Sequence, residues 1–184
     1  MKLMIASDIH GSALYCEKML ERMKEERPEK LILLGDLLYH GPRNDLPEGY
    51  DPRKVIEQLN GIKDMILCVR GNCDCEVDQM VLEFPILADY GFLYPDDIPV
   101  YITHGHIHNQ KRPLPGMKGI LLCGHTHVPA IEKCEGFTYL NPGSVSIPKN
   151  GTKHSYMTYE NGSFLWKDLD SSEVYLRYER KPVI

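Results

Sequence analysis

The amino-acid sequence predicts an α/β domain in which two β-sheets pack together and helices lie outside them. In the first half, stretches typical of buried strands alternate with stretches typical of helices, which favours a largely parallel sheet covered by helices. In the second half, short strand-like stretches follow one another with turns between them. The 184 residues contain no internal repeat, low-complexity tract or linker, so we expect a single domain over residues 1–184.

Two buried strands are predicted at residues 2–7 and 31–34, each of which is a short apolar run. Between them, a helix is expected to begin after the N-cap Ser12 and to end at Pro28. The apolar residues of this helix recur at intervals of three and four and share one face: Cys16, Met19, Leu20 and Met23.

A second helix is predicted where Asp51, a good N-cap, precedes Pro52 at the first helical position. The polar segment 40–50 before it is rich in Pro, Gly and Asn and is expected to be a loop. A third strand is expected at residues 65–69. The inward face of the second helix is expected to hold Val55, Ile56 and Leu59, and that of a third helix Val77, Met80, Val81 and Phe84.

Seven strands are predicted in the second half, with turns such as 160–162 between them. They are expected at residues 100–103, 120–123, 130–133, 138–140, 155–159, 163–167 and 174–180. Together with the first half, they give enough strands for two packed sheets.

Composition excludes several classes of function. Apolar residues make up 42% and charged residues 26%, and the net charge of -5 offers no global attraction to nucleic acid. No stretch approaches the roughly 18 apolar residues of a membrane span, and the start of the chain does not resemble a signal peptide. Six cysteines are present, and their apolar surroundings indicate reduced, buried thiols, so we expect a cytoplasmic protein.

Seven residues that can bind metal ions lie in five short blocks, each beside a glycine and each after a predicted strand. They are Asp8, His10, Asp36, Asn72, His104, His125 and His127. Ligands at separate strand ends suit a preformed site on a rigid scaffold. Two carboxylates, four imidazoles and one amide are enough ligands for two metal ions bridged by a carboxylate. The four nitrogen ligands favour Mn²⁺, Fe or Zn²⁺ over the hard ions Ca²⁺ and Mg²⁺.

Each block alone is common in ordinary loops, but the ordered set is specific. The order Asp-x-His, Gly-Asp, Gly-Asn, His-Gly and Gly-His-x-His resembles the calcineurin-like metallophosphoesterase superfamily. Longer segments resemble a subgroup of small bacterial phosphodiesterases: residues 40–44, 46–50, 70–74, 76–80 and 141–149. The resemblance covers residues 1–150 in detail. It implies a four-layer α-β-β-α sandwich of two mixed sheets flanked by helices.

The resemblance also implies a binuclear metal centre, usually satisfied by Mn²⁺, with Zn²⁺, Fe or Ni²⁺ as alternatives. It assigns Asp8, His10 and His127 to one metal ion. It assigns Asn72, His104 and His125 to the other, with Asp36 as the bridging ligand. In such centres a hydroxide held between the two metal ions attacks phosphorus.

Further residues are candidates for catalysis or substrate binding. Asn72, Cys73 and Asp74 are candidates for catalytic roles, and Arg43 with Asn44 for binding the phosphate oxygens. The wider superfamily often has His where this chain has Cys73. A thiol has an ordinary pKa of about 8.5 and is a poor general acid near neutrality. We therefore expect a preference for activated leaving groups or a narrow range of diesters.

The features together favour a metal-dependent hydrolase that cleaves phosphodiester bonds of small substrates. Two alternatives stay open: a phosphomonoesterase or nucleotidase with the same centre, and a non-catalytic interaction scaffold of the same fold. All seven ligand positions are filled, which favours an enzyme. We expect a small phosphate ester as partner and neither a nucleic-acid polymer nor a membrane, while a homo-oligomer is left open.

Overall fold

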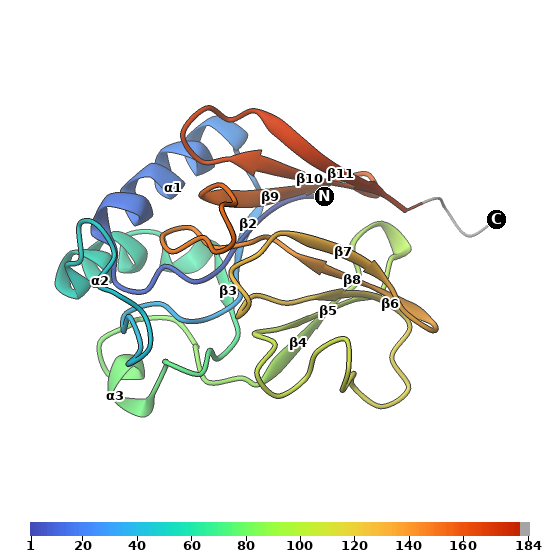
Figure 1. Ribbon diagram of the computed structural model, residues 1–184, viewed down its shortest axis with the longest axis horizontal. Coiled ribbons are helices and arrows are strands. Elements are labelled where there is room, and N and C mark those ends of the chain that lie inside the picture. Colours follow the sequence, from blue (N-terminus) through green and yellow to red (C-terminus); the bar gives the residue numbers. More distant parts are fainter. Residues whose placement is uncertain (181–184) are drawn as a thin grey trace.

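The computed structural model describes residues 1–180, whose strands form two stacked sheets (Figure 1). The first sheet has the order β11-β10-β9-β1-β2-β3, and the second has the order β4-β5-β6-β8-β7. The first contains β1 (Lys2–Ala6), β2 (Lys30–Leu33), β3 (Ile66–Cys68), β9 (Ser155–Glu160), β10 (Ser163–Asp168) and β11 (Val174–Glu179). The second contains β4 (Tyr90–Leu93), β5 (Val100–Thr103), β6 (Gly119–Leu122), β7 (Ala130–Lys133) and β8 (Phe137–Asn141).

Parallel pairing within each sheet brings the predicted ligand blocks together. Strands β1, β2 and β3 are parallel neighbours, and so are β5, β6 and β8. The carboxyl ends of parallel strands meet at one edge of a sheet, which is where side chains on the following loops can converge. Five of these six strands are followed directly by a block of potential metal ligands.

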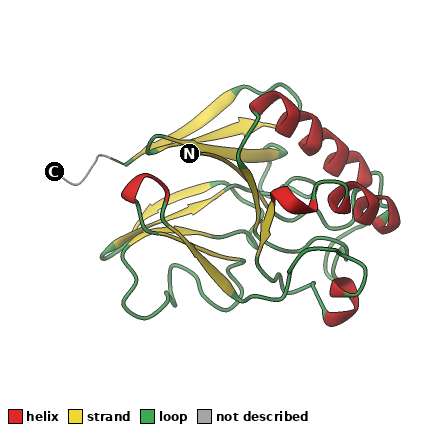
Figure 2. Cartoon of the chain, turned by 180° about the vertical axis from the view of Figure 1, so that it is seen from behind, coloured by secondary structure: helices red, strands yellow, loops and turns green. Residues whose placement is uncertain are grey.

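Two helices, α1 (Ala13–Glu26) and α2 (Pro52–Asn60), cover the outer face of the first sheet (Figures 1 and 2). Both predicted N-caps are confirmed: Ser12 accepts a hydrogen bond from the backbone of Tyr15, and Asp51 accepts one from Lys54. Cys16, Met19, Val55 and Leu59 are buried beneath the helices. These contacts fix both helices on the sheet and so fix the loops at its edge.

The interior between the two sheets is apolar. Buried side chains from both sheets meet there, among them Ile5, Ile32, Ile120 and Leu122. Trp166 is fully buried in this layer, and its indole N–H donates to the carbonyl of Asn141 across the sheets at 2.6 Å. This pairing satisfies the one polar atom of a large apolar side chain.

The predicted fold class is confirmed, since two mixed sheets are stacked and helices flank the first of them. The outer face of the second sheet is covered by the connection between β5 and β6. Leu114 and Met117 of that connection pack on Leu121, Cys123 and Tyr139. No helix among residues 1–180 is long and apolar enough to span a membrane.

The predicted third helix is wrong in length and orientation. Only one turn forms, α3 (Glu76–Gln79), and Val77 and Met80 are exposed by 66% and 82%. The side-chain amide of Gln79 donates to the carbonyls of Leu82 and Phe84, and its oxygen accepts from the backbone N–H of Ile86. The Gln79 side chain thereby pairs backbone N–H and carbonyl groups of an extended segment. Phe84 is buried in this segment without forming part of a helix.

Other departures are smaller. Strand β4 was not predicted, and two short 3₁₀ helices, η1 (Lys63–Met65) and η2 (Pro95–Asp97), border β3 and β4. All six cysteines are free, as expected. Cys16 and Cys123 are buried, whereas four cysteines are only partly buried: Cys68, Cys73, Cys75 and Cys134.

Candidate metal centre

The loops after the strands turn sharply, and the turns aim the predicted ligands inward. Asp8, His10, Asp36, His125 and His127 all have positive φ, between 49° and 67°. This left-handed region is uncommon for residues with a side chain, and it persists only where the surroundings hold it in place. Because five ligands share this conformation, the strain is a property of the site as a whole.

Glycines beside the ligands allow the loops to approach each other closely. A Cβ atom on Gly71 would overlap the backbone and carboxylate of Asp36, and one on Gly124 would overlap the side chain of Ser7. The loop after β3 therefore presses against the loop after β2, and the loop after β6 presses against the loop after β1. The approach of these loops therefore requires a glycine at positions 71 and 124.

The first group of ligands consists of Asp8, His10 and His127. Asp8 Oδ1 lies 3.2 Å from Nε2 of His127 and 3.6 Å from Nε2 of His10. All three side chains are buried. Asp8 Oδ1 is buried and accepts no hydrogen bond from the described residues 1–180. An unpaired buried carboxylate oxygen costs free energy unless a cation or a donor satisfies it.

The second group surrounds His104. Its Nε2 atom lies 3.1 Å from Asn72 Oδ1, 3.2 Å from His125 Nδ1 and 3.4 Å from Asp36 Oδ2. Asp36 Oδ2 also lies 3.6 Å from Nε2 of His10, which belongs to the first group. Asp36 is therefore the carboxylate between the two groups, where a bridging ligand would stand.

Backbone carbonyls orient three of the histidine rings. Nδ1 of His10 contacts the carbonyl of Tyr39 at 2.8 Å, Nδ1 of His104 that of Leu34 at 2.6 Å, and Nδ1 of His127 that of Ile147 at 2.7 Å. A carbonyl only accepts, so each Nδ1 carries the hydrogen atom. Each neutral ring then directs the lone pair of Nε2 into the centre, as metal-binding histidines do.

These lone pairs show that the residues fit a metal ion. The Nε2 atoms of His10 and His127 are 3.2 Å apart. When both rings are neutral, the two lone pairs face each other, which is unfavourable unless a cation lies between them. A cation held by imidazole nitrogens and carboxylate oxygens would also satisfy Asp8 Oδ1. This donor set suits a divalent transition metal.

The charges of the site require compensation. Burial opposes ionisation of Asp8, but its contacts with His10 and His127 prevail and hold the pKa of that carboxyl well below its usual range. Burial likewise opposes protonation of His104, but Asp36 and Asp8 prevail and raise the pKa of His104 to about 9. Two buried carboxylates thus draw positive charge into the centre. Divalent cations would supply that charge in place of protons.

Asp74 connects two of the ligand loops. Its buried carboxylate accepts backbone N–H bonds from Asp36 and Leu37 at 2.8 Å and from Gly71 at 2.7 Å. Asp74 was expected to be a candidate catalytic residue. Its position behind the ligands gives it the means to hold the loop of Asp36 against the loop of Asn72.

The segment after β8 holds the first ligand in place, a role that the motif analysis did not assign. The hydroxyl groups of Ser144 and Ser146 donate to the carbonyl of Asp8 at 2.8 and 3.1 Å. The carbonyl of Ile147 orients His127. Serine residues that bind a backbone carry no motif of their own, and only the alternation of two serines after Gly143 could have indicated them.

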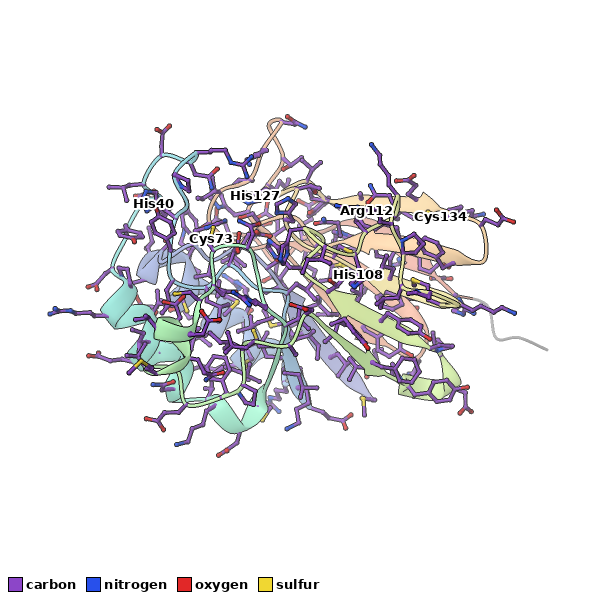
Figure 3. All side chains as sticks on the ribbon, turned by 90° about the horizontal axis from the view of Figure 1, so that it is seen from below. His40, Cys73, His108, Arg112, His127 and Cys134 are labelled. Atoms are coloured by element: carbon purple, nitrogen blue, oxygen red, sulfur yellow. The ribbon has the colours of Figure 1, made fainter. Side chains whose placement is uncertain are left out.

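A cleft of about 380 Å³ opens above the ligands. Four of the predicted ligands line it, namely Asp36, Asn72, His125 and His127. Further lining residues are Arg43, Asn44, Cys73, Thr126 and Lys149. Figure 3 shows Cys73 and His127 near each other, with His40 of the loop 40–50 beyond Cys73. Arg43 and Lys149 bring two exposed cationic side chains to the cleft. Lys149 was not among the predicted substrate-binding residues.

Cys73 lies beside the bridging carboxylate. Its backbone N–H donates to Asp36 Oδ1 at 2.8 Å, and the side-chain amide of Asn72 donates to its sulfur atom at 3.2 Å. Burial and the negative charge of Asp36 raise the pKa of the Cys73 thiol to about 12. The thiol therefore stays protonated and is a poor acid throughout the neutral range.

The two stacked sheets and the cluster of histidines and carboxylates at their common edge define the metallophosphoesterase class of protein. The chain belongs to the calcineurin-like phosphoesterase superfamily, whose domain model matches residues 1–163. The family resemblance expected from the motifs is confirmed. The centre is therefore one for divalent metal ions, as the family and the cluster of ligands both require.

Individual relatives agree with this assignment. Phosphodiesterase YfcE of Escherichia coli K12 is 47% identical over 162 residues, which cover 88% of this chain and 88% of that protein. The solved structure of the E. coli phosphoesterase matches with a TM-score of 0.93 at 43% identity, over 97% of this chain and 99% of that one. Phosphodiesterase MJ0936 of Methanocaldococcus jannaschii is 26% identical over 151 residues, 78% of this chain and 83% of its own.

Proposed function

We propose that this protein is a binuclear metal-dependent phosphodiesterase that hydrolyses small phosphodiesters. The observation that supports this most directly is the set of ring nitrogens and carboxylate oxygens directed at two adjacent points, with Asp36 between them. Asp8, His10 and His127 would hold one ion, and Asn72, His104 and His125 the other. Bound there, two divalent ions would polarise the phosphoryl group and lower the pKa of a water molecule.

The remaining residues of the cleft would bind and orient the substrate. Arg43 lies in the loop after β2, and Lys149 lies in the loop after β8. Each could contact a phosphate oxygen, and Arg43 could form two such contacts at once. The Asn44 side-chain amide donates to the carbonyl of His40 at 2.8 Å, which fixes the loop that presents Arg43. Cys73 would line the pocket without giving a proton, because its thiol is so weak an acid.

The choice of metal and compartment follows from the ligands and the thiols. A mixture of imidazoles, carboxylates and one amide suits Mn²⁺, with Zn²⁺, Fe or Ni²⁺ as alternatives. The six cysteines, all free, support a reducing compartment such as the cytoplasm. Diester specificity is supported by the name of the E. coli relative at 47% identity.

A substrate panel tests this proposal. Purified protein with added Mn²⁺ should hydrolyse bis-p-nitrophenyl phosphate with a higher kcat/KM than p-nitrophenyl phosphate. The reverse preference would identify a phosphomonoesterase with the same centre. Bound metal without turnover of either compound would identify a scaffold that uses the fold alone.

A further inference from the structure

A second cavity lies on the other side of the loop that carries His125. It has a volume of about 180 Å³ and shares His125 and Thr126 with the main cleft. Its remaining lining includes three residues with polar side chains, Asn109, Gln110 and Lys111. We call it the distal cavity. Figure 3 shows Cys73 and His127 with His40 on one side of them. His108 and Arg112 lie on the other side, beside residues that line the distal cavity.

The wall of the distal cavity is held in a defined shape. The side-chain amide of Asn109 donates to the carbonyl of Gly105 at 2.9 Å, and its oxygen accepts from the backbone N–H groups of Lys111 and Arg112 at 3.0 and 3.2 Å. Asn109 and Arg112 also form a two-residue β-bridge. This tight turn presents Gln110 and Lys111, whose side chains make no hydrogen bond or ion pair with other residues among 1–180.

The lining also includes Tyr139, whose side chain is buried. Tyr139 lines the distal cavity, and its hydroxyl oxygen accepts a hydrogen bond from the Asn141 amide at 3.0 Å. The amide of Gln110 and the ammonium group of Lys111 thus border one small cavity, and both are donors that recognise hydroxyl oxygens.

A phosphodiester has two alcohol arms that leave phosphorus in different directions. The main cleft and the distal cavity share His125 and Thr126, so a substrate whose phosphoryl group lies above Asp36 and His125 could place one arm in each. The distal cavity lies beyond His125, where the second arm would extend. Cavities for whole ligands usually exceed about 300 Å³, so about 180 Å³ suits one sugar-sized or glycerol-sized group.

We propose that the distal cavity binds the second alcohol arm of the phosphodiester, and that this arm is a small polyhydroxy group such as a sugar. The inference rests on the proposed phosphodiesterase function and adds the class of substrate. Gln110 and Lys111 are specificity-determining residues under this proposal, because they would contact an arm that a phosphomonoester does not have.

Two substrates with the same leaving group test the proposal. Thymidine 5′-(p-nitrophenyl phosphate) has a sugar-containing arm, and methyl p-nitrophenyl phosphate has an arm too short to reach the cavity. Gln110→Ala and Lys111→Met should each lower kcat/KM about five- to tenfold for the thymidine ester, mainly through KM, as loss of one polar contact does. Both variants should leave the methyl ester unchanged.

Lys118→Ala is the matched control, because Lys118 is an exposed lysine of the same β5–β6 connection and lines neither cavity. It should leave both esters unchanged. Equal effects of Gln110→Ala and Lys111→Met on the two esters, or no effect on either, would overturn the distal subsite while the proposed function stood. Failure of the wild-type protein to hydrolyse either diester with Mn²⁺ bound would overturn the proposed function, and the subsite with it.

Discussion

His10, His104 and His127 each give one ring nitrogen to a backbone carbonyl and keep the other for the centre. The carbonyls belong to Tyr39, Leu34 and Ile147, which no metal-binding motif includes. The identity of the ligands was predictable from side-chain type and order. The tautomer of each ring was not, because it depends on main-chain atoms that only the folded chain places.

The bridging position should be more sensitive to substitution than the cleft wall. Asp36→Asn removes the carboxylate that lies within 3.6 Å of both His10 and His104. We expect it to lower kcat/KM by more than about 100-fold and to reduce bound metal. Arg43→Ala should lower kcat/KM about tenfold, mainly through a higher KM, because one contact with the substrate anion is lost.

Steady-state kinetics with a diester and metal analysis of each variant give the comparison. Asp45→Asn is the control, since Asp45 is exposed in the same loop as Arg43 and lies outside the cleft. If Arg43→Ala proved more damaging than Asp36→Asn, the assignment of the bridging role to Asp36 would be wrong.

Cys73 provides a separate prediction about leaving groups. Cys73→His places an imidazole with a pKa near 6.5 where the thiol pKa is about 12. The substitution should raise kcat/KM most for substrates with poor leaving groups and least for p-nitrophenyl esters, because p-nitrophenol departs without a proton. General acids contribute about 10²–10⁴-fold, and we expect the lower end because Gly41 packs against the sulfur atom.

The measurement is the dependence of kcat/KM on leaving-group pKa for wild type, Cys73→His and Cys73→Ser. A flatter slope for the histidine variant alone supports proton donation from position 73. Parallel lines for all three proteins would show that this residue shapes the pocket and transfers no proton.

Among the secondary-structure elements, the strands were more predictable than the third helix. Strands β1, β2, β5 and β6 are short apolar runs ended by a polar block, and the structure has them within one or two residues of the expected limits. The prediction of a longer third helix was wrong because helical spacing of apolar residues indicates a common face but does not show whether another element packs on that face. The Gln79 side chain and Pro85 favour an extended chain there instead.

Edge strand β4 was missed for a related reason. Its sequence, Tyr90–Leu93, includes a glycine and is only partly buried, so its apolar pattern is weak. Its pairing with β5 depends on the neighbouring strand, which local sequence does not reveal.

Helix α1 is tied to the first sheet through Glu26. The carboxylate accepts from the hydroxyl of Tyr156 at 3.0 Å and pairs with Lys2 at 2.9 Å and with Lys167. Burial opposes its ionisation, but Lys167 and Lys2 prevail and lower the pKa of Glu26. A depressed folded-state pKa contributes stability above the unfolded value of about 4.3, and this contribution is lost as pH falls through the folded pKa.

Glu26→Gln should therefore lower the free energy of unfolding at pH 7 and have a smaller effect near pH 3. Urea unfolding at both pH values measures the difference. Glu21→Gln, on an exposed position of the same helix, is the control and should have little effect at either pH. An equal loss at both pH values would show that Glu26 acts through packing and not through its charge.

At the scale of the whole molecule, two sheets meet at one edge and share one centre. The first half supplies Asp8, Asp36 and Asn72, and the second supplies His104 and His125. The motif order predicted this convergence through the family resemblance. The distal cavity and the contribution of Lys149 were not predictable, because they arise where loops from separate strands come together.

Titration of metal-free protein with Mn²⁺ tests the central claim most directly, namely that two metal ions bound by these seven ligands make the protein a phosphodiesterase. After exhaustive chelation, the protein should stay folded by circular dichroism but hydrolyse no bis-p-nitrophenyl phosphate. Activity should return fully only as the second equivalent of Mn²⁺ per chain binds, with occupancy followed by calorimetry. Full activity with no bound metal, or full activity at a single equivalent, would contradict the binuclear account.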